Sequence, residues 1–175
     1  MIMIKLKANR ILRNLLILIL LATNVGCDQI SKSIVRQKIA YNEEISLIKD
    51  FVTLTKVENT GAFLGLGNQM PRIAYKILMI ILPLIVIGFA LYYLFKKQTL
   101  PNLFILGIGL IAGGGLGNIY DRIIYGSVTD FLHFDFGLFQ TGIVNLADIS
   151  VTAGCFILIY ERSINRKRLK PTILE

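Results

Sequence analysis

The stretch GGGLGNIYDRIIYGSVTDFLHF, residues 113–134, is followed along the chain by VNLADIS, residues 144–150. These two segments place two carboxylates, Asp130 and Asp148, at the edges of strongly apolar runs. A carboxylate beside hydrocarbon is costly to keep, so in a membrane protein it marks a candidate functional site. We therefore expect the rest of the chain to be organised around this pair.

The composition is that of a membrane protein. Of the 175 residues, 54% are hydrophobic, and the mean hydropathy of +0.65 is higher than a soluble domain usually has. The net charge of +8 does not indicate nucleic-acid binding, because basic and aromatic residues do not alternate in a groove-like pattern. Basic residues instead cluster before the first apolar run, after the second and after the last. With four spans, the positive-inside rule places these clusters and both termini in the cytoplasm.

Four apolar segments are expected to cross the bilayer as helices, because each can span about 30 Å of hydrocarbon at about 1.5 Å per residue. They lie at about residues 11–33, 73–95, 103–121 and 143–161. The first segment lacks a small-residue cleavage site, which favours a retained helix over a signal peptide. Cys27 follows Gly26 as in a lipobox, but Asn24 stands where that motif has a Leu-like residue. Pro83 is expected to kink the second helix.

The third apolar segment is rich in glycine between residues 107 and 117. Small residues let neighbouring membrane helices approach closely, so helix packing is the favoured interpretation. The alternative is that the backbone of residues 113–117 clears space for a substrate.

Two segments are expected outside the hydrocarbon. Within residues 34–71, FVTLTKVEN alternates as a strand with one buried face does, which predicts a small extracytoplasmic β element. Residues 122–142 are amphipathic and rich in phenylalanine, which predicts a short interfacial helix or loop. The sequence therefore predicts a single mainly α membrane domain over residues 1–175.

Polar residues of separate spans fall at one depth in this topology, near the outer face. They are Asp28 and Lys32 on the first span, Asn118, Asp121 and Arg122 on the third, and Asn145 and Asp148 on the fourth. Asp130 lies just before the fourth span and can fold back towards Asp148. Polar groups at membrane depth must satisfy one another, so we expect a connected cluster.

Two neighbouring carboxylates cannot both ionise cheaply, so they share a proton, and one acts as base while the other acts as acid. This is the chemistry of an aspartic protease. The alternative is that Asp130 caps a short helix and Asp148 pairs with a basic side chain, and the spacing alone leaves both interpretations open. Asp28 and Lys32, four residues apart, suit a simple salt bridge.

A metal centre is not expected. His133 is the only histidine, the sequence has no His-Glu-x-x-His, and the two cysteines lie in apolar surroundings. These features exclude a zinc peptidase of that type.

The residues resemble the bacterial lipoprotein signal peptidases, also called signal peptidase II. The matching pieces, in chain order, are Asp28-Gln29 with Lys32, the stretch Glu58 to Phe63, Gly117-Asn118 with Asp121-Arg122, Val128 with Asp130-Phe131, and Asn145 with Ala147-Asp148. Each piece is short, but five of them in this order on a four-span frame are specific. Val144 departs from the Phe that the family usually has before its Asn-x-Ala-Asp motif.

The resemblance implies that Asp130 and Asp148 are the catalytic aspartates. It implies that the binding site is lined by Asn59, Gly61, Asn118, Arg122 and Asn145, with Asp28, Lys32 and Asp121 supporting it. The implied substrate is a prolipoprotein whose cysteine already carries diacylglycerol, cut on the amino side of that cysteine at the outer face of the bacterial cytoplasmic membrane. The family needs no metal or organic cofactor, contacts membrane lipid and is the target of globomycin-type inhibitors.

Three alternatives come from other classes. A small transporter would use the carboxylates as a proton relay, but the polar residues gather at one depth and do not line a path across the bilayer. A scaffold assembled through the glycine-rich segment leaves Asp130 and Asp148 unexplained. An intramembrane protease of the presenilin type would carry a Gly-x-Gly-Asp-like motif, which neither aspartate has.

Overall fold

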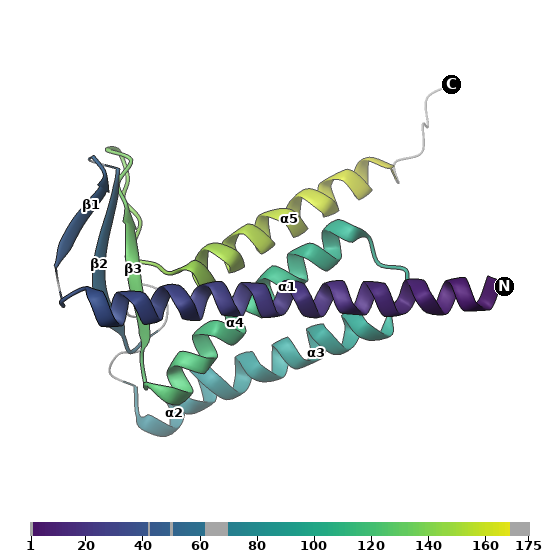
Figure 1. The fold of residues 1–175 in the computed structure, drawn as a ribbon, viewed down its shortest axis with the longest axis horizontal. Coiled ribbons are helices and arrows are strands. Elements are labelled where there is room, and N and C mark those ends of the chain that lie inside the picture. The colour runs from purple at the N-terminus through teal and green to yellow at the C-terminus, as the bar shows by residue number, and fades with distance from the viewer. Residues whose placement is uncertain (1, 42, 50, 62–69, 169–175) are drawn as a thin grey trace.

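The structure is a computed structural model that describes residues 2–41, 43–49, 51–61 and 70–168. Its elements, in chain order, are α1 (Ile2–Lys38), β1 (Glu44–Ile48), β2 (Val52–Asn59), α2 (Arg72–Lys76), a π-helical turn η2 (Ile77–Ile81), α3 (Leu82–Lys96), α4 (Asn102–Ile124), β3 (Val128–Phe134) and α5 (Leu146–Arg168). The long helices extend away from a small sheet that lies across one end of them (Figure 1). The mainly α architecture with a small β element is therefore confirmed.

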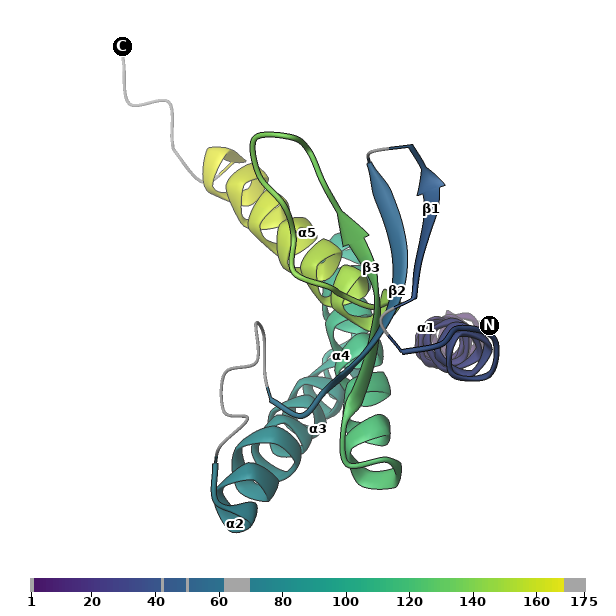
Figure 2. The ribbon, with the colours of Figure 1, turned by 90° about the vertical axis from the view of Figure 1, so that its left-hand side faces the viewer.

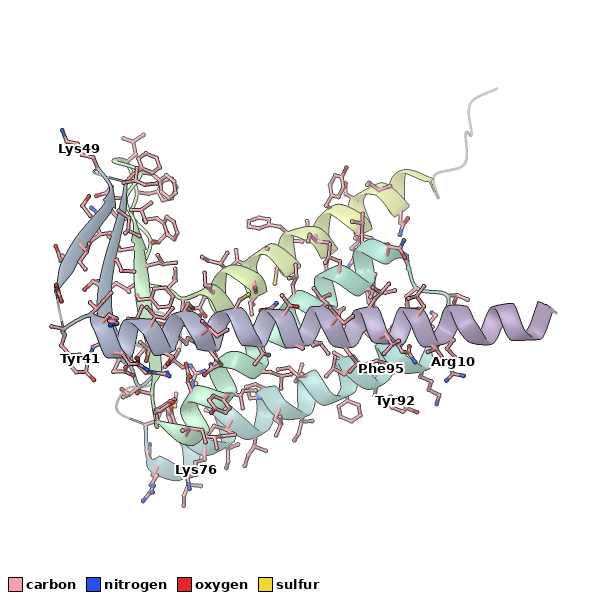
Figure 3. All side chains as sticks on the ribbon, viewed as in Figure 1. Arg10, Tyr41, Lys49, Lys76, Tyr92 and Phe95 are labelled. Atoms are coloured by element: carbon pink, nitrogen blue, oxygen red, sulfur yellow. The ribbon has the colours of Figure 1, made fainter. Side chains whose placement is uncertain are left out.

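Three of the described helical segments are long and apolar enough to cross a membrane: Arg10–Lys38, Arg72–Lys96 and Asn102–Ile124. The second of these joins α2, η2 and α3 into one rod. Large apolar side chains such as Phe89 point outward from these helices, as expected of surfaces that face lipid. Arg10 and Tyr92 lie at the helix ends opposite the sheet, whereas Tyr41 and Lys49 lie at the sheet end (Figure 3).

The rod is irregular just before Pro83, as the sequence predicts. The π-helical turn η2 ends at Ile81, and Pro83 lies in the first turn of α3. Proline has no backbone N–H and its ring crowds the preceding turn, so a local widening of the helix accommodates it.

Helix α4 is the centre of the bundle and contacts α1, α3 and α5. Its glycines permit this, because a Cβ added at Gly114 would lie 2.4 Å from the carbonyl oxygen of Ala147 on α5. Gly107 and Gly154 face each other in the same way, with a Cβ on Gly154 only 2.6 Å from the carbonyl oxygen of Gly107. Close packing is therefore what these glycines provide.

The sheet is antiparallel in the order β1-β2-β3, and its third strand comes from residues 122–142 (Figure 2). The prediction of an interfacial helix or loop there was incomplete, because β3 occupies Val128–Phe134. Residues 128–131 are all buried, so polar and apolar residues do not alternate along this strand and the sequence does not predict it. The β element also begins later than expected, since α1 continues to Lys38. The turn-rich residues 62–69 lie outside the described residues.

Gly114→Ala is expected to lower the free energy of unfolding by about 1–3 kcal/mol, because the added methyl group meets a backbone carbonyl that cannot turn aside. Gly88→Ala on α3 is the matched control, since nothing lies within 4 Å of its added Cβ. Thermal unfolding of the detergent-solubilised proteins compares the two. Equal stability of both variants would contradict the proposed packing of α4 on α5.

Candidate functional site

The site is built around the ammonium group of Lys32 on α1, which is completely buried. Its Nζ lies 2.8 Å from Asp28 Oδ2 and 2.8 Å from Asp121 Oδ2. It also donates a hydrogen bond of 2.8 Å to Asn118 Oδ1. Lys32 therefore hydrogen-bonds to Asp28 and Asn118, and its charge is paired with those of Asp28 and Asp121. The expected pair of Asp28 and Lys32 is confirmed, but it is a buried centre that joins α1 to α4.

A glycine makes this approach of α1 to α4 possible. A Cβ added at Gly117 would lie 2.6 Å from Asp28 Oδ2. The other oxygen of Asp28, Oδ1, accepts a hydrogen bond of 3.0 Å from the backbone N–H of Ala147 in the first turn of α5. Asp28 therefore joins α1 to α5 directly, and it joins them to α4 through Lys32, which contacts Asn118 and Asp121.

The side-chain amide of Asn118 lies between Lys32 and Asp148 and forms a hydrogen bond with each of them. Because its Oδ1 accepts from Lys32, its Nδ2 must point the other way, and it donates a hydrogen bond of 2.8 Å to Asp148 Oδ1. The amide of Asn118 thus has a single consistent orientation between a cation and a carboxylate.

Asn145 and Asp148 form a capping box at the start of α5. The backbone N–H of Asp148 donates to Asn145 Oδ1 at 3.0 Å, and the backbone N–H of Asn145 donates to Asp148 Oδ2 at 3.2 Å. Such a reciprocal pair satisfies two N–H groups that a helix start leaves free. The Asp148 carboxylate is consequently fixed on both oxygens, close to the positive end of the α5 dipole.

Asp130 approaches the same place from β3. Its Oδ2 accepts a hydrogen bond of 2.9 Å from Asn59 Nδ2, and its Oδ1 accepts one of 2.6 Å from Asn145 Nδ2. Asn145 therefore contacts both carboxylates, that of Asp130 through its side-chain amide and that of Asp148 through its backbone N–H. Burial raises the pKa of the Asp130 carboxyl from 3.8 to about 6, and the charge of Asp148 acts in the same direction. The hydrogen bonds from Asn59 and Asn145 act against this rise in pKa.

The remaining predicted residues lie around this core. Asp121 is fully buried, and its Oδ1 lies 2.9 Å from Arg36 Nη2. Arg122 Nη2 donates a hydrogen bond of 2.9 Å to the carbonyl oxygen of Gly61, just after β2. The structure thus brings all ten predicted residues to the sheet end of the bundle. Asp130 lies in a strand and does not cap a helix, so that alternative is excluded.

Sequence reasoning missed Arg36 and Thr129. Arg36 Nε donates a hydrogen bond of 2.7 Å to Thr129 Oγ1, and its guanidinium lies 3.9 Å from the centre of the Tyr125 ring. Its position four residues after Lys32 was the available signal, because it places both on one face of α1. Thr129 gave no signal, since its role depends on a strand that the sequence did not reveal.

A metal-binding cluster is not present among the residues that the structure describes: no three His, Cys, Asp or Glu side chains converge there. His133 lies in β3, where its Cα is paired with that of Thr53.

The sequence matches the family model of signal peptidase (SPase) II over residues 17–164. The chain belongs to the signal peptidase II family. It is similar to the lipoprotein signal peptidase of Halothermothrix orenii, with 41% identity over 132 residues, which cover 75% of this chain and 84% of that protein. It is similar to that of Streptococcus pneumoniae, with 37% identity over 135 residues, 77% of this chain and 84% of that protein.

The fold of this family member also matches solved structures. One bacterial membrane enzyme superposes with a TM-score of 0.79 at 23% identity, over 91% of this chain and 94% of that one. A second gives a TM-score of 0.73 at 25% identity, over 89% and 94% of the two chains. The protein is therefore a bacterial multi-pass membrane peptidase, and a small transporter is not supported.

Lys32→Met is expected to destabilise the peptidase by about 3–5 kcal/mol, because it leaves Asp28 and Asp121 buried without their shared cation. Lys38→Met is the matched control, since Lys38 is exposed on the same helix. Thermal unfolding in detergent measures the difference. If the two variants unfolded at the same temperature, Lys32 would not be the structural centre of the site.

The raised pKa of Asp130 predicts a pH dependence of stability. The folded state favours the protonated acid, so its stabilisation is complete below pH 3.8 and is lost as the pH rises through about 6. Unfolding curves from pH 3.5 to 7 should show that the wild type loses about 3 kcal/mol more than Asp130→Asn over this window. Parallel curves for the two proteins would contradict the assignment of this pKa shift to Asp130.

Proposed function

We propose that this chain is an aspartic endopeptidase that removes the signal peptide from diacylglyceryl-modified prolipoproteins. It would cut on the amino side of the lipidated cysteine. The observation that carries the proposal is the side chain of Asn145, which contacts Asp130 directly and fixes Asp148 through the capping box. Two carboxylates from a strand and a helix start are thereby held at one point with different surroundings. Such a difference separates an acid from a base.

Asp148 is assigned as the base and Asp130 as the acid. Asp148 accepts hydrogen bonds from Asn118 and from a backbone N–H at the start of α5, and these donors hold its two carboxylate oxygens in place. The burial that raises the pKa of Asp130 favours a retained proton on that carboxyl.

The reaction then proceeds in two proton-balanced steps. Asp148 takes a proton from water while the water oxygen bonds to the scissile carbonyl carbon, and Asp130 gives its proton to the carbonyl oxygen, which yields a gem-diol. As the C–N bond breaks, Asp148 gives its proton to the leaving nitrogen and Asp130 takes one back from the gem-diol. Both carboxyl groups end in their starting states.

The neighbouring residues are assigned binding and support. Asn59, Gly61 and Arg122 lie together where β2 ends, and we assign them to the peptide backbone of the substrate. Asn118 and Asn145 orient the two aspartates. Asp28, Lys32 and Asp121 hold the helices under the site, as their mutual contacts of 2.8 Å support.

The membrane topology belongs to the same proposal. We assign α5 as a fourth span, place both termini in the cytoplasm through their basic residues, and place the sheet and the site at the outer face. A precursor anchored by its acyl chains presents its scissile bond near that interface, which is the depth of the assigned aspartates. Membrane lipid and globomycin-type inhibitors are the further expected ligands.

Asp130→Asn and Asp148→Asn are each expected to abolish cleavage of a lipidated precursor, because each removes one partner of the proton exchange. Asp135→Asn is the control, since the Asp135 carboxylate accepts hydrogen bonds from Gly137 and Gln140 at the far end of the sheet. Cleavage is followed by the size of the precursor after incubation with purified protein in detergent. Full cleavage by either aspartate variant would exclude the dyad.

Substrate specificity is tested with one precursor in lipidated and unlipidated forms, each with and without globomycin. The proposal expects cleavage of the lipidated form only, and its inhibition by globomycin. Equal cleavage of both forms would contradict the requirement for diacylglycerol without affecting the assignment of the aspartates.

A further inference from the structure

Strand β2 contains a β-bulge directly beside Asp130 of β3. Before the bulge, Leu54 pairs with Leu132 of β3, whereas after it Val57 pairs with Asp130. Three steps along β2 therefore correspond to two along β3, and the extra residue falls at Thr55–Lys56. A bulge of this kind reverses which side chains of its strand point to each face.

The reversal decides which residue meets Asp130. After the bulge, Asn59 pairs with Val128, so Asn59 shares the face of Val128 and Asp130. Without the extra residue the register would place Glu58 opposite Val128 and turn Asn59 to the other face. Asn59 donates a hydrogen bond to Asp130, whereas a carboxylate in its place would repel that aspartate.

Glu58 is held on the opposite face by its own partners. Its two carboxylate oxygens accept hydrogen bonds from Ser127 Oγ and from Thr129 Oγ1, the second at 2.7 Å. Thr129 is in turn contacted by Arg36 of α1. The bulge thus keeps Glu58 on the face opposite to that of Asp130, although Glu58 is next to Asn59 in the chain.

Lys56 ties the bulge to α1. It is 7% exposed, which is low for a lysine, and its Nζ lies 4.1 Å from the centre of the Tyr41 ring. The same Nζ donates a hydrogen bond of 3.4 Å to the carbonyl oxygen of Arg36 in the last turns of α1. A cation near a helix C-terminus is favourable there. Tyr41 and Lys56 are also paired as an isolated bridge, so the contact involves backbone and side chain together.

We propose that Lys56 is a positioning residue for the peptidase: by fixing the bulge at Thr55–Lys56 against Tyr41 and the end of α1, it keeps Asn59, and not Glu58, on the face of Asp130. The inference rests on the proposed role of Asp130. It assigns a function to the contacts of Lys56 with Tyr41 and Arg36, which act on Asp130 through the register of the sheet.

Lys56→Met retains most of the side-chain length but removes the cation, so it is expected to lower kcat/KM at least about tenfold by releasing the hydrogen bond from Asn59 to Asp130. Lys56→Arg and Tyr41→Phe, which keep a cation over a ring, should retain activity, whereas Tyr41→Leu should lose it. Lys49→Met is the matched control, since Lys49 is exposed at the turn of the hairpin. Loss of activity in Lys56→Arg equal to that in Lys56→Met would contradict the cation–ring contact.

Deleting Thr55 from the Lys56→Met variant separates positioning from general instability. The deletion removes the extra residue, so a regular strand now places Asn59 opposite Val128 without any bulge. Activity should return towards the wild-type value. If Lys56 only stabilised the fold, deleting Thr55 would not restore activity to the Lys56→Met variant. Failure of the deletion to restore activity would therefore overturn the proposal.

The register can be measured without activity. With Cys27 and Cys155 replaced by alanine, a short thiol cross-linker should join Asn59→Cys to Val128→Cys in the otherwise wild-type chain, and Asn59→Cys to Ser127→Cys after Lys56→Met. An unchanged cross-link in Lys56→Met would overturn the inference. If the wild type cleaved no lipidated precursor, the proposed function would fail, yet the cross-link would still report whether Lys56 sets the register.

Discussion

The buried ammonium of Lys32 is the interaction on which the rest of the structure depends. A completely buried cation needs opposite charge and hydrogen-bond acceptors close by, and it finds them in Asp28, Asp121 and Asn118. The two carboxylates need the cation equally, so neither α1 nor α4 can shift without leaving a charge unpaired. The glycine at position 117 lets the two helices come close enough for this arrangement. The ion pairs of Lys32 thus fix how α1 packs against α4.

Lys32 and the residues that contact it also position the side chains of the candidate site. Asn118 is oriented by Lys32 and presents its amide N–H to Asp148, while Asp28 contacts the first turn of α5, where Asp148 and Asn145 cap the helix. Each of the two aspartates is then fixed by a regular element, Asp148 by a helix start and Asp130 by a strand between covered faces. Groups on rigid elements are placed more exactly than groups on loops, which suits the proton exchange that we propose for the two carboxyl groups.

The sheet contributes a second constraint, because the number of residues in β2 decides which of its side chains lie on the face of Asp130. Side chains alternate along a strand, so one extra residue at Thr55–Lys56 exchanges the faces of Glu58 and Asn59. Both faces of β3 are in use near Asp130: Asn59 and Asn145 bind the aspartate on one, and Glu58 and Arg36 bind Thr129 on the other. The sheet and α1 are therefore coupled through Arg36 on one side and Lys56 on the other.

The sequence by itself determined the apolar helices and the pairing of Asp28 with Lys32, because segment length, hydropathy and i,i+4 spacing are local properties. The resemblance to signal peptidase II implied the ten residues that gather at the sheet end. Only the tertiary structure decided that residues 128–134 form a strand, that Arg36 joins Thr129, and that a bulge selects Asn59. The strand and its bulge depend on the pairing of β2 with β3, which are separated by about seventy residues of chain. Burial of β3 also removes the alternation of polar and apolar residues that would have predicted a strand there. A pairing between distant segments leaves no local pattern, so the register beside Asp130 had to come from the fold.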